Sequence, residues 1–268
     1  MISAWFVMSA STLSLVLEVV FAVLGLLVGS HLAVLADRIP AGRPTSTGRS
    51  QCDSCATTLK WFELVPVLSR VVQRSRCRTC SAHIPAMSTV VELTTAALFA
   101  ALAASFGLRW ELGGYLVFAA GLTVLTVIDL RTQRLPRRII YMTAALGAPF
   151  LVAGALLVDE PVRLQWAIYG SLGAVLFFVL LYLGWRGSMG DGDVRLAALI
   201  GLFLGWIGPM HVPVGLFMGF LAGAVVGSVL LARGASRRSK VAFGPYLALG
   251  AIATIFVGHP LIRLWLHQ

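Results

Sequence analysis

Charged residues are scarce in this chain of 268 residues. They make up only 12% of the sequence, and only 11 are acidic, whereas 58% of all residues are hydrophobic. A soluble domain usually has about 25% charged and about 45–50% apolar residues. The shortage of charge excludes an ordinary soluble protein, because one soluble core cannot account for so many long apolar runs. The composition predicts an all-α polytopic membrane protein.

The N-terminal segment also lacks basic residues, since neither Lys nor Arg occurs in residues 1–12. A secretory signal peptide has a basic segment before its apolar stretch, so we do not expect a cleaved signal here. The first apolar run, residues 13–36, is long enough to cross a membrane as a helix. The chain shows no internal repeat and no low-complexity tract.

Eight apolar segments are present, and they predict about eight transmembrane helices. They are residues 13–36, 88–107, 112–129, 139–158, 165–185, 194–208, 213–232 and 244–266. The sixth has only about 15 residues, fewer than the roughly 20 that a crossing requires. We expect it to tilt little, to begin below the membrane surface, or to be shielded by its neighbours.

The basic residues are concentrated in alternate connections between the apolar segments. If the N-terminus lies outside, 18 of the 21 Lys and Arg residues face the cytoplasm. Only Arg109, Arg163 and Arg263 then lie outside. The positive-inside rule therefore places both termini outside for eight spans. It also explains the net charge of +10 without a nucleic-acid partner, and the basic loop 233–240 is expected to lie against anionic membrane lipid.

One connection, residues 37–87, is polar and basic and differs in kind from the others. We interpret it as a small cytoplasmic insert between the first two membrane helices. The expected division is a first transmembrane helix at 1–36, the insert at 37–87 and a seven-helix membrane domain at 88–268.

The chain has only four cysteines, and all of them lie in this insert. They form two CxxC pairs, CDSC at 52–55 and CRTC at 77–80. Two such turns can complete a tetrahedral zinc site, and disulfides are disfavoured in the reducing cytoplasm. We therefore predict a structural zinc site that folds the insert. Its ligands would be Cys52, Cys55, Cys77 and Cys80, while a redox or disulfide role remains as the alternative.

Two of the few acidic residues are expected at the same membrane face. Asp129 ends the third apolar segment and Asp193 precedes the sixth, both on the cytoplasmic side. Ionisable residues at membrane depth are costly and are therefore functional candidates. A carboxylate pair that shares one proton can activate water, as in aspartic proteases. Gly190 and Gly192 lack Cβ atoms and would let an extended peptide backbone approach.

Each aspartate also has a non-catalytic interpretation. Aspartate is a preferred helix N-cap, so Asp193 could serve only to cap its helix. Asp129 could pair with Arg131 or Arg134 at the membrane surface, which contributes little to stability. Physical reasoning from the residues alone leaves catalysis and these structural roles about equal. Glu92, which follows the insert in the second apolar segment, is a candidate supporting residue.

Six motifs occur along the chain in a specific order. They are GSHLAVLADRIP (29–40), the paired CxxC turns with ELVPVLS (63–69) between them, VVELTTA (90–96), IDLRTQRLP (128–136), MGDGDVRLAALIG (189–201) and FGPYLALGA (243–251). Together they resemble the type IV prepilin peptidases, which are bifunctional prepilin leader peptidase/N-methyltransferases. This family belongs to the GxGD class of membrane aspartic proteases. The resemblance covers nearly the whole chain.

The resemblance implies a role for each matching residue. The catalytic acid of GxGD follows the second glycine, so Asp193 takes that role and Asp191 falls on the variable position. Asp129 takes the place of the other catalytic acid, and the four cysteines take the zinc-binding places. Arg195 stands where the family usually has Lys and is a candidate supporting residue. The family's arginine-tyrosine-proline is replaced within AMSTVVEL (86–93), a departure that bears on the methyltransferase activity.

The resemblance also implies a multifunctional hydrolase of the bacterial inner membrane, active in type IV pilus assembly and protein secretion. It would cleave prepilin or pseudopilin leaders after glycine and methylate the new N-terminus with S-adenosylmethionine. On the residues alone, two other classes stay open. A proton-coupled transporter would place its carboxylates near mid-membrane, and a non-catalytic membrane scaffold with a zinc module would need neither aspartate.

Overall fold

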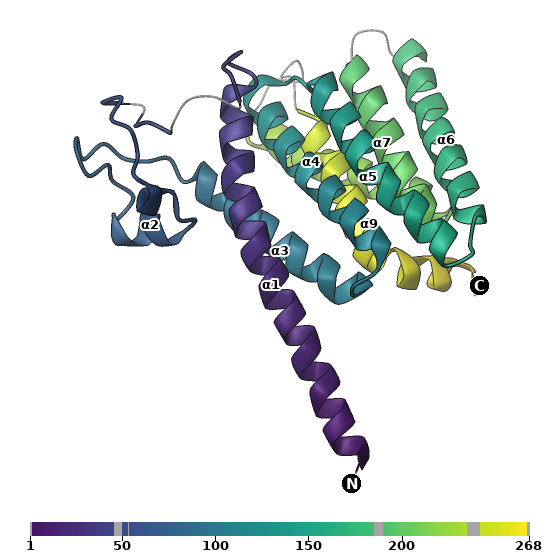
Figure 1. The fold of residues 1–268 in the computed structure, drawn as a ribbon. Coiled ribbons are helices and arrows are strands. Elements are labelled where there is room, and N and C mark those ends of the chain that lie inside the picture. Colours follow the sequence, from purple (N-terminus) through teal and green to yellow (C-terminus); the bar gives the residue numbers. More distant parts are fainter. Residues whose placement is uncertain (1, 46–49, 53, 185–189, 235–241, 267–268) are drawn as a thin grey trace. The chain divides into compact units, whose positions relative to one another are not determined.

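The computed structural model describes residues 2–45, 50–52, 54–184, 190–234 and 242–266 (Figure 1). Within these residues the regular structure is helical, apart from two isolated β-bridges in the insert. The chain divides into two compact units, residues 1–108 and 109–268. The first unit joins the first expected membrane helix, the insert and the second expected helix. Most of the basic loop 233–240 lies outside the described residues.

The first unit is built on two long antiparallel helices, with the insert between them in sequence. Its elements are α1 (Ile2–Arg38), the 3₁₀ helix η1 (Trp61–Leu64), α2 (Leu68–Val72) and α3 (Met87–Phe106). A Cβ on Gly25 would lie 2.6 Å from Cα of Ala96, and one on Gly29 would lie 2.7 Å from Cα of Glu92. Glycines four residues apart thus let the two backbones pack closely, as in membrane helix pairs.

The second unit is a bundle of six helices. They are α4 (Trp110–Thr132), α5 (Arg137–Leu157), α6 (Val162–Gly184), α7 (Asp191–Ile207), α8 (His211–Ala232) and α9 (Gly244–Leu266). Helices next to each other in sequence pack as pairs, α4 with α5, α6 with α7, and α8 with α9. Glycine permits close approach here as well, because a Cβ on Gly201 would lie 2.4 Å from the carbonyl oxygen of Gly170. The central helix α4 is the most buried of the long apolar helices.

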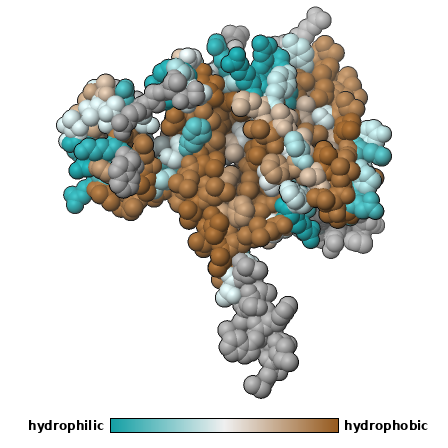
Figure 2. All heavy atoms as spheres, in the orientation of Figure 1, coloured by the Kyte–Doolittle hydropathy of each residue, from teal (hydrophilic) through white to brown (hydrophobic). Residues whose placement is uncertain are grey.

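Six helices in the described part of the chain are long and apolar enough to cross a membrane. They are residues 14–38 of α1 together with α3, α4, α5, α6 and α8. The two remaining apolar segments also form helices, but α7 has 17 residues, and in α9 the stretch Gly244–Gly258 forms a shorter apolar helix within the residues that the structure describes. Apolar side chains cover much of the visible helical surface (Figure 2). The prediction of a multi-pass, all-helical membrane protein is therefore confirmed, with six of the eight expected spans meeting the length criterion.

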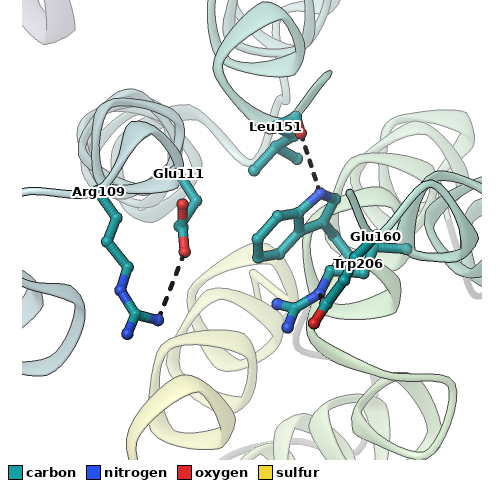
Figure 3. Close-up of polar contacts among 6 residues, drawn as sticks. Arg109, Glu111, Leu151, Glu160 and Trp206 are labelled. Carbon is teal, nitrogen blue, oxygen red and sulfur yellow. Dashed lines mark hydrogen bonds and ion pairs between the residues drawn. The ribbon is translucent and has the colours of Figure 1, made fainter. Parts of the chain in front are cut away.

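At the end of the bundle where α4 begins and α7 ends, polar contacts join α5, α6 and α7, and an ion pair lies within the start of α4 (Figure 3). The indole nitrogen of Trp206 donates to the carbonyl oxygen of Leu151 at 3.2 Å. Buried Glu111 lies 4.0 Å from the guanidinium of Arg109. The guanidinium of Arg163 stacks 4.7 Å from the centre of the Trp206 ring. These contacts fix the helices at the end opposite the two aspartates.

Candidate active site and metal site

Asp129 lies in the last turn of α4 and is only 4% exposed. Its Oδ2 atom accepts a hydrogen bond from the backbone N–H of Gly244, at a distance of 2.9 Å. Gly244 is the first residue of α9, so the positive end of that helix faces the carboxylate. The structure therefore gives the Asp129 carboxylate a backbone N–H as a hydrogen-bond partner.

Glycine is required at position 244 by the space around Asp129. A Cβ there would lie 2.7 Å from Oδ2 of Asp129 and 3.1 Å from Cδ2 of Leu135. No role for Gly244 or Leu135 could be assigned from the sequence alone. The Gly-Pro pair at the start of an apolar run was the available signal, because proline is favoured in the first turn of a helix.

Asp193 lies in the first turn of α7, three residues after the N-cap residue Gly190. Its Oδ2 atom accepts the Gly190 N–H at 3.1 Å, and its own N–H donates to the Gly190 carbonyl at 3.2 Å. Asp193 thus stabilises the start of its helix, as the capping interpretation expected, although from the third helical position. It also lies close enough to Asp129 for the two carboxylates to repel each other electrostatically.

Asp191 and Asp193 have different surroundings, although only one residue separates them. Asp191 forms an ion pair with Arg195 one turn later, with 2.7 Å between Oδ2 and Nη2. Its side chain is 74% exposed, so this pair contributes little to stability. The structure therefore places Arg195 beside Asp191 on the surface and Asp193 beside Asp129.

The two glycines of the motif also differ. A Cβ on Gly192 would lie 2.9 Å from Cβ of Leu135, so this glycine permits a close approach of Leu135 to α7. Leu135 therefore contacts both the start of α7 and the start of α9. Gly190 is exposed, and the nearest atom to a Cβ there would be Oδ2 of Asp193 at 3.5 Å. Among the described residues, the open side of the motif is therefore the Gly190 side.

Glu92 lies on α3 in the first unit and takes part in a different contact. The side chain is buried, and its Oε2 atom accepts the backbone N–H of Val67 at 2.9 Å. Val67 has φ 58°, a conformation that is uncommon for a β-branched residue. Glu92 therefore fixes a strained residue of the insert against the membrane helix.

The four cysteines come together as a group that could hold a metal ion. Their Sγ atoms all lie within 4.8 Å of one another. Cys52 and Cys80 are 3.8 Å apart, and Cys55 and Cys77 are 3.9 Å apart. A tetrahedral zinc ion with Zn–S distances of about 2.3 Å would place its sulfurs about 3.8 Å apart, so the residues fit zinc. None of the four forms a disulfide.

The two cysteine pairs repeat the same backbone pattern. Cys52 donates its N–H to the Thr57 carbonyl, and Cys77 donates to the Ala82 carbonyl, at 3.0 and 2.9 Å. Each turn is closed by an antiparallel bridge, Gln51 with Thr58 and Arg76 with His83. This local structural repeat is not visible in the sequence beyond the CxxC spacing. Exposed His83 is not a member of the cysteine group.

The thiols of the group differ in acidity. A hydrogen bond with the Thr57 hydroxyl lowers the pKa of Cys55 to about 6. Backbone N–H groups of Cys80 and Thr79 lower the pKa of Cys77. The Ala82 backbone lowers the pKa of Cys80, but desolvation and the neighbouring thiols together raise it to about 12. The lowered pKa values favour the thiolate at Cys55 and Cys77. The thiolate is the form of cysteine that binds metal.

Comparison with known proteins assigns the family. Residues 23–106 match the Bacterial Peptidase A24 N-terminal domain, and residues 116–228 match the Type IV leader peptidase family. The prepilin leader peptidase/N-methyltransferase of Bacillus subtilis (strain 168) is 31% identical over 246 residues, which cover 91% of this chain and 96% of that protein. The chain belongs to the type IV leader peptidase family.

Other curated members are similar to the chain over most of its length. The prepilin leader peptidase/N-methyltransferase of Burkholderia pseudomallei (strain 1026b) is 33% identical and covers 90% of this chain and 86% of its own. The protein of that name from Myxococcus xanthus (strain DK1622) is 36% identical over 78% of this chain and 62% of its own. No solved structure matches the chain. The family that the six motifs resemble is thus confirmed.

Proposed function

We propose that this family member is a membrane aspartic endopeptidase that removes the leader peptide of type IV prepilins or pseudopilins. It cleaves after glycine at the cytoplasmic membrane face and then methylates the new N-terminus. The observation that carries the proposal is the proximity of Asp129, in the last turn of α4, to Asp193, in the first turn of α7. The names of the relatives support it, and the transporter and scaffold hypotheses have no such support.

In the proposed reaction the two carboxylates share one proton and act on one water molecule. The ionised aspartate takes a proton from water, whose oxygen attacks the scissile carbonyl carbon. The protonated aspartate donates to the carbonyl oxygen, and a proton then passes to the leaving nitrogen as the C–N bond breaks. Among the described residues, one oxygen of each aspartate accepts a backbone N–H. The other oxygen remains for water and substrate.

The arrangement of the helices supports a cytoplasmic active site. The end of α4 and the starts of α7 and α9 meet at the aspartates, and the basic connection 130–138 follows α4 directly. Basic connections face the cytoplasm in membrane proteins. We propose that α7 and α9 complete eight crossings in the bacterial inner membrane, with both termini outside. The cleavage site of a substrate would lie at Gly190, on the open side of the GxGD motif.

We propose zinc as the structural metal of the four-cysteine site. The sulfur spacing fits a tetrahedral ion, and four thiolates would leave no coordination position for a substrate. Such a site stabilises a segment that is too short to form a hydrophobic core of its own. Zinc would thus hold the two CxxC turns together and take no part in peptide cleavage.

We propose S-adenosylmethionine as the methyl donor of the second reaction. When bound to the enzyme, S-adenosylmethionine would supply an electrophilic methyl group to the free amine that cleavage exposes. The methyltransferase activity in the names of the relatives supports this step. The insert and the start of α3 belong to the matched N-terminal domain, and we expect them to serve methylation rather than cleavage.

Mass spectrometry of a co-expressed prepilin tests both activities together. Cleavage removes the mass of the leader, and methylation then adds one methyl group to the new N-terminus. We expect both changes with the unmodified enzyme. If the prepilin keeps its leader although the enzyme is well expressed in the same cells, the peptidase assignment is contradicted. A product that is cleaved but not methylated would contradict only the second activity.

A further inference from the structure

The insert exposes an apolar surface on the short helix α2. Leu68, Val71 and Val72 are 60%, 68% and 73% exposed, and Leu64 of η1 is also exposed. Positions 68, 71 and 72 are spaced so that they share one face of a helix. Figure 2 shows apolar atoms gathered on one side of the insert. Exposed clusters of this kind mark interaction sites more often than isolated apolar residues do.

The other face of α2 is fixed to the start of the membrane helix α3. The guanidinium of Arg70 donates to the carbonyl oxygens of Ile84 and Pro85 and, at 2.9 Å, to the Ser88 hydroxyl. The N–H of Val67 reaches Glu92, five residues beyond the first residue of α3. The contacts with Ser88 and Glu92 hold α2 near the first turns of α3.

The level of α2 along α3 sets its depth in a bilayer. The whole of α3, Met87–Phe106, is a candidate span of 20 residues, which is about 30 Å at 1.5 Å per residue and equals a typical hydrocarbon core. The backbone of Glu92 then lies about 7.5 Å below the boundary at Met87, and its side chain leans back toward that boundary, where it meets Val67. Interfacial helices bury their apolar face about 5–10 Å into the boundary between headgroups and acyl chains. Val90 and Leu93 of α3 are also exposed at this level.

The charges around the apolar surface agree with a lipid partner. Segment 60–80 contains one acidic residue, Glu63, and five basic residues, Lys60, Arg70, Arg74, Arg76 and Arg78. Four of these basic residues are exposed, and among them Arg74 and Arg76 follow α2 directly in sequence. Basic side chains beside an apolar helix face favour anionic lipid headgroups. The same positive charge disfavours binding of the proposed substrate's leader to this surface, because that leader is also basic.

We propose that α2 is an interfacial membrane anchor. Leu64, Leu68, Val71 and Val72 enter the cytoplasmic leaflet, and Arg74 and Arg76 bind anionic headgroups. The anchor holds the four-cysteine insert against the membrane surface at the start of α3. The inference does not depend on the peptidase activity, because it rests on contacts within the first unit.

Photo-crosslinking of the full-length protein in nanodiscs tests the anchor. A benzophenone amino acid replaces Val72 or, separately, Val71, in bilayers of mixed phosphatidylglycerol and phosphatidylcholine. After irradiation we expect a mass increase of one lipid on the peptide that carries the benzophenone. The same side chain at exposed Leu180 on the span α6 is the positive control, and exposed Thr58 in the first cysteine turn is the negative control. The lipid adduct should be several-fold more abundant at Val72 than at Thr58.

Two outcomes would overturn the proposal. One is the absence of lipid adducts at both Val71 and Val72 while Leu180 is labelled. The other is crosslinking of both positions to protein, which would mean that another part of this chain or a second copy covers the surface. The use of two neighbouring positions separates these outcomes from a folding defect in one variant.

Discussion

The N–H of Gly244 donates to Oδ2 of Asp129 over 2.9 Å and joins residues that are 115 positions apart in sequence. The bond connects the last turn of α4 to the first residue of α9. It fixes the orientation of the carboxylate and directs the positive end of a helix toward it. The geometry of Asp129 therefore depends on a residue without a side chain.

We expect Gly244→Ala to impair cleavage strongly. The added Cβ would lie 2.7 Å from Oδ2 of Asp129, so the carboxylate or the start of α9 must move. Displacement of a catalytic group by about 1 Å can reduce the rate about 100-fold. Gly173→Ala on α6 is the matched control, because a Cβ there meets no atom within 4 Å. The rate of prepilin cleavage in reconstituted membranes measures the effect, and equal rates for the two variants would refute it.

Replacement of single acids should separate the two aspartates of the GxGD motif. We expect Asp193→Asn and Asp129→Asn to reduce cleavage by about 10²–10⁴-fold, the usual contribution of a general acid or base. Asp191→Asn should retain most of the activity, because Asp191 pairs with Arg195 at the surface. The N-terminus of a co-expressed prepilin reports the result. Complete processing by the Asp193→Asn enzyme would remove Asp193 from the mechanism.

Loss of one cysteine should release the metal. We expect purified Cys52→Ser protein to contain much less zinc than the unmodified protein, and its insert to exchange amide hydrogens faster. His83→Ala should keep its zinc, because His83 is exposed and outside the cysteine group. Elemental analysis gives the zinc content of each protein. Unchanged zinc and unchanged exchange in Cys52→Ser would show that the four thiols do not form the site.

Glu92 should hold the insert through Val67. Removal of the carboxylate in Glu92→Ala leaves the Val67 N–H without its acceptor. A hydrogen bond contributes about 0.5–1.5 kcal/mol, so we expect amide exchange at Val67 to accelerate several-fold. Glu63→Ala is the control, since Glu63 accepts the N–H of Lys60 in the same insert. Hydrogen-exchange mass spectrometry of residues 63–72 measures both variants, and equal exchange would contradict this role.

Features that depend on local patterns could be predicted from the sequence. The apolar runs predicted the membrane helices, because a spanning helix must be apolar along its whole length. The CxxC spacing predicted the group that brings Cys52 close to Cys80, since two tight turns can present four thiolates to one ion. The positive-inside rule predicted that Asp129 and Asp193 share one end of the molecule.

Contacts between distant segments could not be predicted in this way. No local pattern identifies Gly244 as the partner of Asp129 or Glu92 as the partner of Val67. The expected helix start at residue 194 was also late, because α7 begins at Asp191 after the extended backbone of Gly190. Asp193 consequently lies inside the helix. The five-residue helix α2 was not expected, because its stability depends on contacts with α3 rather than on its own propensity.

The glycines of α1 have a consequence for the placement of the insert. Gly25 and Gly29 contact the backbone of α3 so closely that a slip of one residue would bring a larger side chain into that space. The helix pair therefore has a single permitted register, in which one residue corresponds to about 1.5 Å along the axis. Because both ends of the insert emerge from this pair, its distance from the bilayer is set by two glycines inside the membrane.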